Sequence, residues 1–416
     1  MPFSEPSFIK SVLHLQLQYA NIGIISAYFR IKKSVILVRV QVKNGLRLAM
    51  MFNSFYLSPN LFSENQRAFW KRTALMSLSR IEEFLFGHTL KVGQTQSEVI
   101  SEIGKVKLIH YVPFKKRIYP VPVLIITPLL SKPYILDLYP GLSFVEYLVK
   151  QGLDVYLMDF GVPDDNDRDL GFEDYIFGYI PYAVEGVLKA TSSNSLSLLG
   201  YCLGGVFTLL YVTLTDNPVK NIVLVASPVD FSKLGLHYHY WRNVDADRLV
   251  NTFGNIPPEL IIISFNLIAG IKDPFRYLRK PLGFLQDISN KEYVKRKLLI
   301  NRWLIESPPF PAKAFKQLII EFFYKNAMIK MDIRMKGKLA DLSRIKCPVL
   351  ILSHTADVVS PPASARVLLD LISSQDTEFL EVSGGDAGHI DIIVGNEGAE
   401  FTWPRIASWL KHRSNK

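Results

Sequence analysis

Ser195-Leu-Ser-Leu-Leu-Gly-Tyr-Cys-Leu-Gly-Gly205 is the stretch of this sequence that says most about the fold. An apolar run typical of a buried strand ends in a Gly200-x-Cys202-x-Gly204 turn, and a helix is predicted over Leu203–Thr215. Strand, tight turn and helix in this order indicate a nucleophile elbow, here with cysteine in place of serine. The glycines are needed because side chains two residues either side of the nucleophile would clash with the neighbouring strand and helix. The helix amino end behind Cys202 favours negative charge, which helps both a thiolate and an oxyanion.

Outward from this stretch, strands and helices alternate along the chain. The predicted strands are apolar throughout, which indicates a parallel sheet covered on both faces. Before residue 231, strands are predicted at Val106–Tyr111, Pro122–Thr127, Asp154–Asp159, Ser195–Leu199 and Asn221–Ala226, with helices at Phe144–Gln151 and Asp174–Ala190. The pattern resumes with strands at Pro348–Ser353 and Thr377–Val382 and helices at Ala363–Ile372 and Phe401–Lys411. This alternation predicts a doubly wound, mostly parallel α/β domain, and with the elbow it predicts an α/β-hydrolase fold.

Residues 231–345 interrupt the alternation with aromatic residues, prolines and helical periodicity. An insertion after a strand's carboxyl end lies over the crevice where open α/β sheets bind ligands, so we predict a helical cap. The core then consists of residues 96–230 and 346–416, one part on each side of the cap. Residues 1–95 are predicted to form a mostly helical region of unknown role. Within it, helices are expected at Ser11–Ala27 and Ala68–Phe86.

An elbow nucleophile needs an acid and a base, which follow it in that chain order. Asp357 comes directly after a predicted strand, and His389 lies 32 residues further on in the glycine-rich loop that begins at Gly384. In this arrangement His389 takes the thiol proton of Cys202, and Asp357 holds the imidazole in the required tautomer. The sequence therefore predicts a catalytic triad of Cys202, Asp357 and His389.

Each of these residues also has a plainer interpretation. Cys202 could be a small core residue before a glycine-rich turn, and Asp357 could be a turn or helix cap. Asp386 and Asp391 lie nearer to His389 in sequence, and His354 is the main rival for the role of base.

An oxyanion hole needs two backbone N–H groups close to the nucleophile. One is expected from Leu203, the residue after Cys202. The other is expected from the loop after the strand Pro122–Thr127, and Leu130 is the favoured donor there.

Composition narrows the class of protein. The chain has 416 residues, of which 49% are hydrophobic, and this excludes a mainly disordered or fibrous protein. The formal charge of +10 suits a phosphate-bearing substrate or an anionic surface, and the absence of a nucleic-acid motif argues against nucleic acid as a partner. Two cysteines without metal-ligand spacing predict an intracellular, metal-free protein. Neither a signal peptide nor an apolar stretch of about 18 residues is found, so we expect no transmembrane segment.

These residues resemble the polyhydroxyalkanoate synthases, most closely the shorter class III and class IV catalytic subunits. The family's G-x-C-x-G box is matched by Gly200–Gly205, and its downstream aspartate and Gly-His are matched by Asp357 and Gly388-His389. The resemblance covers about residues 95–412. Further stretches that resemble the family are Lys132–Leu138, Asp154–Gly161, Gly254–Pro257, Trp303–Pro308 and Phe401–Pro404.

The resemblance implies an acyltransferase that polymerises (R)-3-hydroxyacyl-coenzyme A. Cys202 would be acylated with release of coenzyme A, and a hydroxyl of a bound unit or chain would then attack the acyl thioester. By the same resemblance, His389 activates Cys202, and Asp357 assists the attacking hydroxyl as well as the histidine. No cofactor is implied, because the coenzyme A thioester is itself the substrate. A cytoplasmic protein at the surface of polyester granules is implied, with a second synthase subunit and a homodimer open as partners.

Two other functions remain open at this point. The same fold could carry a thioesterase or esterase, although cysteine at the elbow favours transfer to an acceptor other than water. The chain could also be a non-catalytic paralogue that associates with granules.

Overall fold

We describe the protein from a computed structural model, which describes residues 64–114, 119–272, 289–384 and 388–414. The chain divides into two units, residues 1–54 and 55–416, and every described residue belongs to the second unit. The expected helix at Ser11–Ala27 and residues 385–387 of the His389 loop lie outside the described residues.

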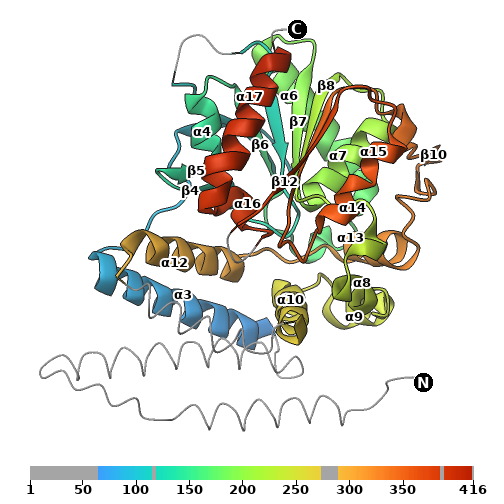
Figure 1. Cartoon of the computed structure of the whole chain (residues 1–416). Coiled ribbons are helices and arrows are strands. Elements are labelled where there is room, and N and C mark those ends of the chain that lie inside the picture. Colours follow the sequence, from blue (N-terminus) through green and yellow to red (C-terminus); the bar gives the residue numbers. More distant parts are fainter. Residues whose placement is uncertain (1–63, 115–118, 273–288, 385–387, 415–416) are drawn as a thin grey trace, which may run out of the picture. The chain divides into compact units, whose positions relative to one another are not determined.

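An eight-stranded sheet forms the centre of the unit (Figure 1). Its strands are, in spatial order, β1 (Ser97–Ile103), β2 (Val106–Tyr111), β6 (Val155–Asp159), β3 (Val123–Ile126), β7 (Leu196–Tyr201), β8 (Val219–Val225), β11 (Val349–His354) and β12 (Thr377–Val382). From β6 to β12 all neighbours are parallel, whereas β1 and β2 pair antiparallel at one edge. The prediction of a mostly parallel sheet is confirmed, and β1 is an additional strand that we did not predict.

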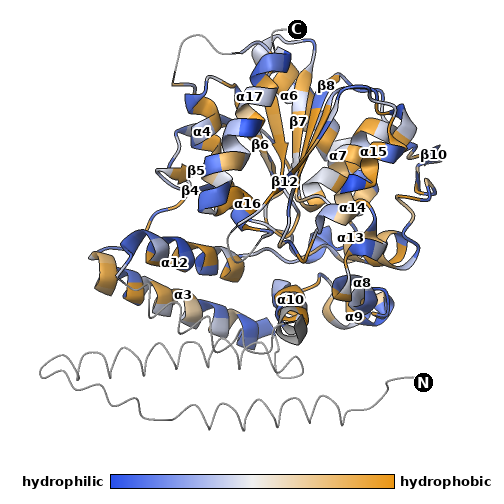
Figure 2. Cartoon of the chain, viewed as in Figure 1, coloured by the Kyte–Doolittle hydropathy of each residue, from blue (hydrophilic) through white to orange (hydrophobic). Residues whose placement is uncertain are grey.

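Alternate residues of the central strands pack into different hydrophobic clusters. Leu124 and Ile126 of β3 lie in one cluster, and Val123 and Ile125 lie in the other. Successive side chains of a strand point to opposite faces, so both faces of this sheet are covered. Figure 2 shows the central strands as hydrophobic along their length, whereas the covering helices have mixed surfaces. This double burial explains why the strand sequences are apolar throughout.

Helices cover the two faces in separate groups. One face packs against α4 (Phe144–Lys150), α16 (Asp391–Val394) and α17 (Trp403–Ser414). The other packs against α6 (Ile180–Thr191), α7 (Leu203–Leu214), α14 (Pro362–Arg366) and α15 (Leu368–Leu371). The predicted helix at Asp174–Ala190 is found as α5 (Phe172–Asp174), a π-helical turn at Tyr175–Tyr179 and α6.

The interval predicted as a cap is mainly helical where the structure describes it. It contains α8 (Leu236–Trp241), α9 (Ala246–Phe253), α10 (Pro258–Lys272), α12 (Lys291–Ile305) and α13 (Ala312–Gln317). Helices α8, α9, α10 and α12 lie beyond the carboxyl ends of the strands (Figure 1). In the described ranges, no helix is long and apolar enough to cross a membrane.

Helix α3 (Glu64–Phe86) forms over the predicted Ala68–Phe86 region and packs against α12. The Glu82 side chain is fully buried and pairs with Arg302 of α12. Glu82 also accepts a hydrogen bond of 2.9 Å from the Leu90 N–H, and Arg302 donates to the Leu90 carbonyl at 2.7 Å. The pair therefore fastens α3 and the segment after it to α12.

A partly buried polar cluster joins β1 and β2 to the start of β6. The His110 ring lies 2.8 Å from the Asp154 carboxylate and 3.4 Å from that of Glu98, and it stacks on Tyr156. Burial lowers the pKa of His110, but hydrogen bonds and charge from Asp154 and Glu98 raise it by more, so the net shift is upward. A raised folded-state pKa means that the stabilisation is complete below the unfolded pKa of about 6.5 and is lost as pH rises through the folded pKa.

We therefore expect His110→Gln to destabilise the protein more at pH 5.5 than at pH 9. Hydrogen bonds to charged groups contribute about 1.5–3 kcal/mol, so the loss at low pH should be of that order. Urea unfolding at both pH values measures the difference, with the exposed His412→Gln as the matched control. An equal loss at both pH values would contradict this assignment of charge to His110.

Candidate active site

The predicted elbow lies between β7 and α7. β7 ends at Tyr201, α7 begins at Leu203, and Cys202 between them has φ 54° and ψ −122°. A positive φ is rare for a residue with a side chain and marks local strain. The Cys202 N–H donates to the Val225 carbonyl of β8 at 2.9 Å, which holds the turn in place. The neighbouring strand β8 thus supports a conformation that an isolated turn would not keep.

The glycines around Cys202 lie where no side chain fits. A Cβ on Gly200 would lie 2.4 Å from the Gly205 Cα, and one on Gly205 would lie 1.9 Å from the Ser227 Oγ. A Cβ on Gly204 would lie 2.0 Å from the Ile126 carbonyl oxygen at the end of β3. These distances give the physical reason for the spacing seen in the sequence: the first turn of α7 packs directly on the backbone of β3.

Gly204→Ala is expected to destabilise the fold by about 3 kcal/mol or more, because the contacting atom is main chain of a central strand and cannot move aside. Denaturant unfolding measures the loss. Gly178→Ala is the matched control, because nothing lies within 4 Å of a Cβ added at Gly178. Equal stability of the two variants would contradict the close packing of α7 on β3.

Asp357 follows β11, and its carboxylate is buried. Its Oδ2 lies 2.7 Å from Nδ1 of His389. Its Oδ1 accepts hydrogen bonds from the N–H groups of Val359 at 2.7 Å and Ser360 at 2.8 Å. Asp357 is therefore both a turn cap and the partner of His389, so the two interpretations of this residue describe the same carboxylate.

His389 lies between Asp357 and Cys202. Its ring hydrogen-bonds the Asp357 carboxylate through Nδ1 and also hydrogen-bonds the Cys202 side chain. Burial lowers the pKa of His389, while the charges of Asp357 and Cys202 and their hydrogen bonds raise it by more, so the pKa is held well above its usual range. The charge of Asp357 thus strengthens His389 as the base that accepts a proton from Cys202. Cys202, Asp357 and His389, distant in sequence, meet at the carboxyl ends of β7, β11 and β12.

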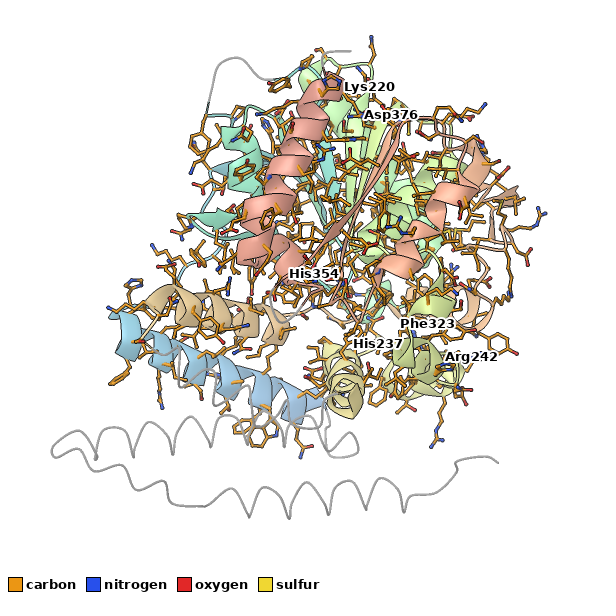
Figure 3. All side chains as sticks on the ribbon, viewed as in Figure 1. Lys220, His237, Arg242, Phe323, His354 and Asp376 are labelled. Carbon is orange, nitrogen blue, oxygen red and sulfur yellow. The ribbon has the colours of Figure 1, made fainter. Side chains whose placement is uncertain are left out.

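His354, the rival base, hydrogen-bonds a backbone N–H group two residues further on. It is the last residue of β11 and is fully buried, and its Nδ1 accepts the Ala356 N–H at 3.0 Å. Figure 3 shows it at the end of the sheet that faces the cap helices, opposite Lys220 and Asp376 at the amino ends of β8 and β12. Its Nε2 is buried without a hydrogen-bond partner among the described residues.

The two expected oxyanion donors lie on the segments that flank Cys202. Leu203 is the first residue of α7, where a helix N–H has no intrahelical partner. Leu130 is the third residue of a turn after β3, closed by a 3.1 Å hydrogen bond from the Ser131 N–H to the Pro128 carbonyl. Each follows the carboxyl end of one of two neighbouring strands, β7 and β3, and their role as oxyanion donors stays a prediction.

Cys347, the second cysteine, lies before β11 and is remote from this chemistry. Burial raises the pKa of the Cys347 thiol to about 11, so the thiol stays protonated at neutral pH. The two thiols therefore differ in their surroundings: Cys202 hydrogen-bonds His389, and Cys347 is held in its protonated form by burial.

Sequence reasoning missed the contacts that hold the loops of the site. The Trp303 indole N–H of α12 donates to the Lys132 carbonyl at 3.0 Å, two residues after Leu130. The Tyr201 hydroxyl donates to the His389 carbonyl at 3.1 Å. The signals were weak: Trp303 lies in a stretch that resembles the synthases, and Tyr201 is marked by its place beside Cys202.

Comparison with known families gives two matches that overlap along the chain. Residues 69–148 match the model described as the N-terminus of poly-beta-hydroxybutyrate polymerase. Residues 121–395 match the alpha/beta hydrolase fold. The second match covers the elbow, Asp357 and His389, and it confirms the predicted fold class.

Several curated relatives share the name of a polymerase subunit. The chain is 36% identical over 296 residues to the poly(3-hydroxyalkanoate) polymerase subunit PhaC of Allochromatium vinosum, covering 71% of this chain and 81% of that protein. It is 31% identical over 328 residues to the subunit of the same name from Haloferax mediterranei, covering 78% of this chain and 65% of that longer protein. The Thiocystis violacea subunit is 32% identical over 337 residues, with 80% and 93% covered.

Proposed function

The chain belongs to the poly(3-hydroxyalkanoate) polymerase family, and on this premise we propose that it is a catalytic subunit that polymerises (R)-3-hydroxyacyl-coenzyme A into polyester. One observation carries the proposal: a cysteine on a strained elbow hydrogen-bonds a histidine that a buried aspartate holds. A thiolate is both a good nucleophile and a good leaving group, so an acyl group can be passed on instead of being stranded.

The first half of the reaction acylates Cys202. His389 takes the thiol proton, the sulfur attacks the thioester carbonyl, and the N–H groups of Leu203 and Leu130 stabilise the resulting oxyanion. Collapse of this intermediate breaks the bond to the coenzyme A sulfur. The leaving thiolate accepts the proton from His389, so coenzyme A is released as a thiol and Cys202 carries the acyl group.

The second half extends the chain. A hydroxyl of another acyl unit attacks the Cys202 thioester, an ester bond forms, and the bond to sulfur breaks. His389, with Asp357 behind it, accepts the hydroxyl proton and returns it to the departing cysteine. The catalyst is thereby restored. Only the hydroxyl, in place of water, distinguishes this step from hydrolysis.

Partners and location follow from the same premise. The relatives are named as subunits of a polymerase, which supports a synthase that works with a second subunit. We propose that the protein acts in the cytoplasm at the surface of the polyester that it makes, where an insoluble product remains attached to its catalyst.

The test measures coenzyme A release and polymer recovery from (R)-3-hydroxybutyryl-coenzyme A, with the full chain alone and after addition of candidate second subunits. Release with polymer is the expected result. Release of free hydroxy acid without polymer would replace the proposal by a thioesterase. No release under any condition would replace it by a non-catalytic paralogue.

A further inference from the structure

Tyr201 links the strand that carries the nucleophile to the loop that carries the base. It is the last residue of β7, its side chain is 2% exposed, and its hydroxyl donates to the main-chain oxygen of His389 at 3.1 Å. The two rings also stack, with centroids 5.9 Å apart and 24° between their planes. The Tyr201 hydroxyl therefore donates its single proton to the main-chain carbonyl of His389.

The main chain of His389 comes after two glycines that both have positive φ. Gly384 has φ 113° and Gly388 has φ 60°, conformations that glycine adopts with little cost. Gly388 also packs against the peptide before Asp357, where an added Cβ would lie 2.6 Å from the Asp357 nitrogen. Specific contacts therefore hold the backbone next to His389: the close packing of Gly388 on Asp357 and the hydrogen bond from the Tyr201 hydroxyl.

We propose that Tyr201 is a positioning residue, whose hydroxyl fixes the main chain of His389 at the place from which its ring reaches both Asp357 and Cys202. This inference rests on the proposed function for its meaning in turnover, but the geometry concerns the triad itself. Asp357 holds the ring of His389 through Nδ1, and Tyr201 holds the backbone from which the ring projects. Two anchors on different atoms fix both the orientation and the position of the imidazole.

Tyr201 is not a further acid or base. Burial raises the pKa of its phenol, and the charges of Cys202, Asp357 and Asp391 raise it further, so the pKa lies well above the usual range. The hydroxyl stays protonated wherever the enzyme works. Its contribution is therefore geometric, and it should appear in the rate of chemistry rather than in substrate binding.

The experiment compares Tyr201→Phe with Tyr211→Phe, both in a Cys347→Ala background. Phenylalanine keeps the buried ring and removes only the hydroxyl, and Tyr211 is another buried tyrosine, on α7. Two quantities are measured: the pH dependence of Cys202 alkylation by iodoacetamide, and kcat and KM for coenzyme A release. Circular dichroism establishes that each variant is folded.

In Tyr201→Phe we expect alkylation at neutral pH to slow roughly tenfold and to recover at high pH, where the thiol ionises without His389. We expect kcat to fall roughly 10- to 100-fold with KM within about twofold, the scale reported for misplacing a catalytic group by about 1 Å. Tyr211→Phe should match the parent in both measurements.

Alkylation in Tyr201→Phe with the parental pH profile would overturn the positioning role, as would equal losses in both variants. Alkylation needs no turnover, so it tests Tyr201 even if the parent releases no coenzyme A. A parent protein that releases no coenzyme A would count against the proposed function alone. Should Tyr201→Phe not fold, Tyr201→Met, a flexible buried side chain without a donor, takes its place with the same expected slowing and the same overturning result.

Discussion

Cys202→Ala abolishes covalent acylation and turnover while the fold stays intact. The sulfur is the atom that forms and breaks the acyl bond, and removing a nucleophile of this kind costs on the order of 10⁶-fold in rate. Alanine keeps a Cβ, so it makes the same backbone demand at φ 54° as cysteine does. Intact-mass measurement after incubation with (R)-3-hydroxybutyryl-coenzyme A detects the acyl adduct, and a thiol reagent quantifies released coenzyme A.

Cys347→Ala is the matched control for this variant. Its thiol lies outside the triad and its pKa is raised to about 11 by burial, so activity should remain close to that of the parent. Turnover in Cys202→Ala at the parental rate would refute the elbow assignment. Loss of adduct in Cys347→Ala with an intact fold would show that the wrong thiol had been chosen.

His389→Ala lowers turnover by about 10²–10⁴-fold, the range that a positioned acid–base group contributes. Asp357→Asn should cause a loss of similar size, because the amide cannot supply the negative charge that raises the pKa of His389. With that charge gone, the pKa of His389 falls. A weaker base takes the Cys202 proton less readily, so alkylation of Cys202 should slow at neutral pH and recover only at high pH, where the thiol ionises without His389.

The measurement is the rate of iodoacetamide alkylation against pH for both variants, together with coenzyme A release. His412→Ala is the control, because His412 is exposed on α17. A parental pH profile in Asp357→Asn would mean that Asp357 caps its turn without influencing the histidine. The double variant should lose little more than either single one, since residues that act as a unit are not additive.

Much of the fold was predictable because the central strands are buried on both faces. Pro122–Thr127 and Pro348–Ser353 are apolar runs with turn residues around them, and they became β3 and β11. The edge strand β1 has the sequence SEVISEI and is largely exposed, so it lacks the apolar run that reveals a central strand. Its pairing with β2 depends on the hairpin at Gly104, which periodicity alone did not reveal.

The triad could be proposed because chain order and strand ends determine where its members meet. The contacts around it could not. Tyr201 and His389 are 188 residues apart, and Glu82 and Arg302 are 220 residues apart. A single sequence contains no signal for such distant pairs. The π-helical turn at Tyr175–Tyr179 was missed for another reason: one widened turn leaves the apolar periodicity of a helix almost unchanged.

The position of each triad member in the sheet determines the temperature at which the protein loses activity. Cys202 follows β7, which is hydrogen-bonded on both sides to β3 and β8, so its amides should exchange with solvent only through global opening. His389 follows β12, an edge strand that the sheet holds on one side alone. Partial opening at that edge separates the base from a nucleophile that is still folded. Thermal inactivation should accordingly begin below the melting temperature, as a reversible loss that leaves most of the secondary structure in place.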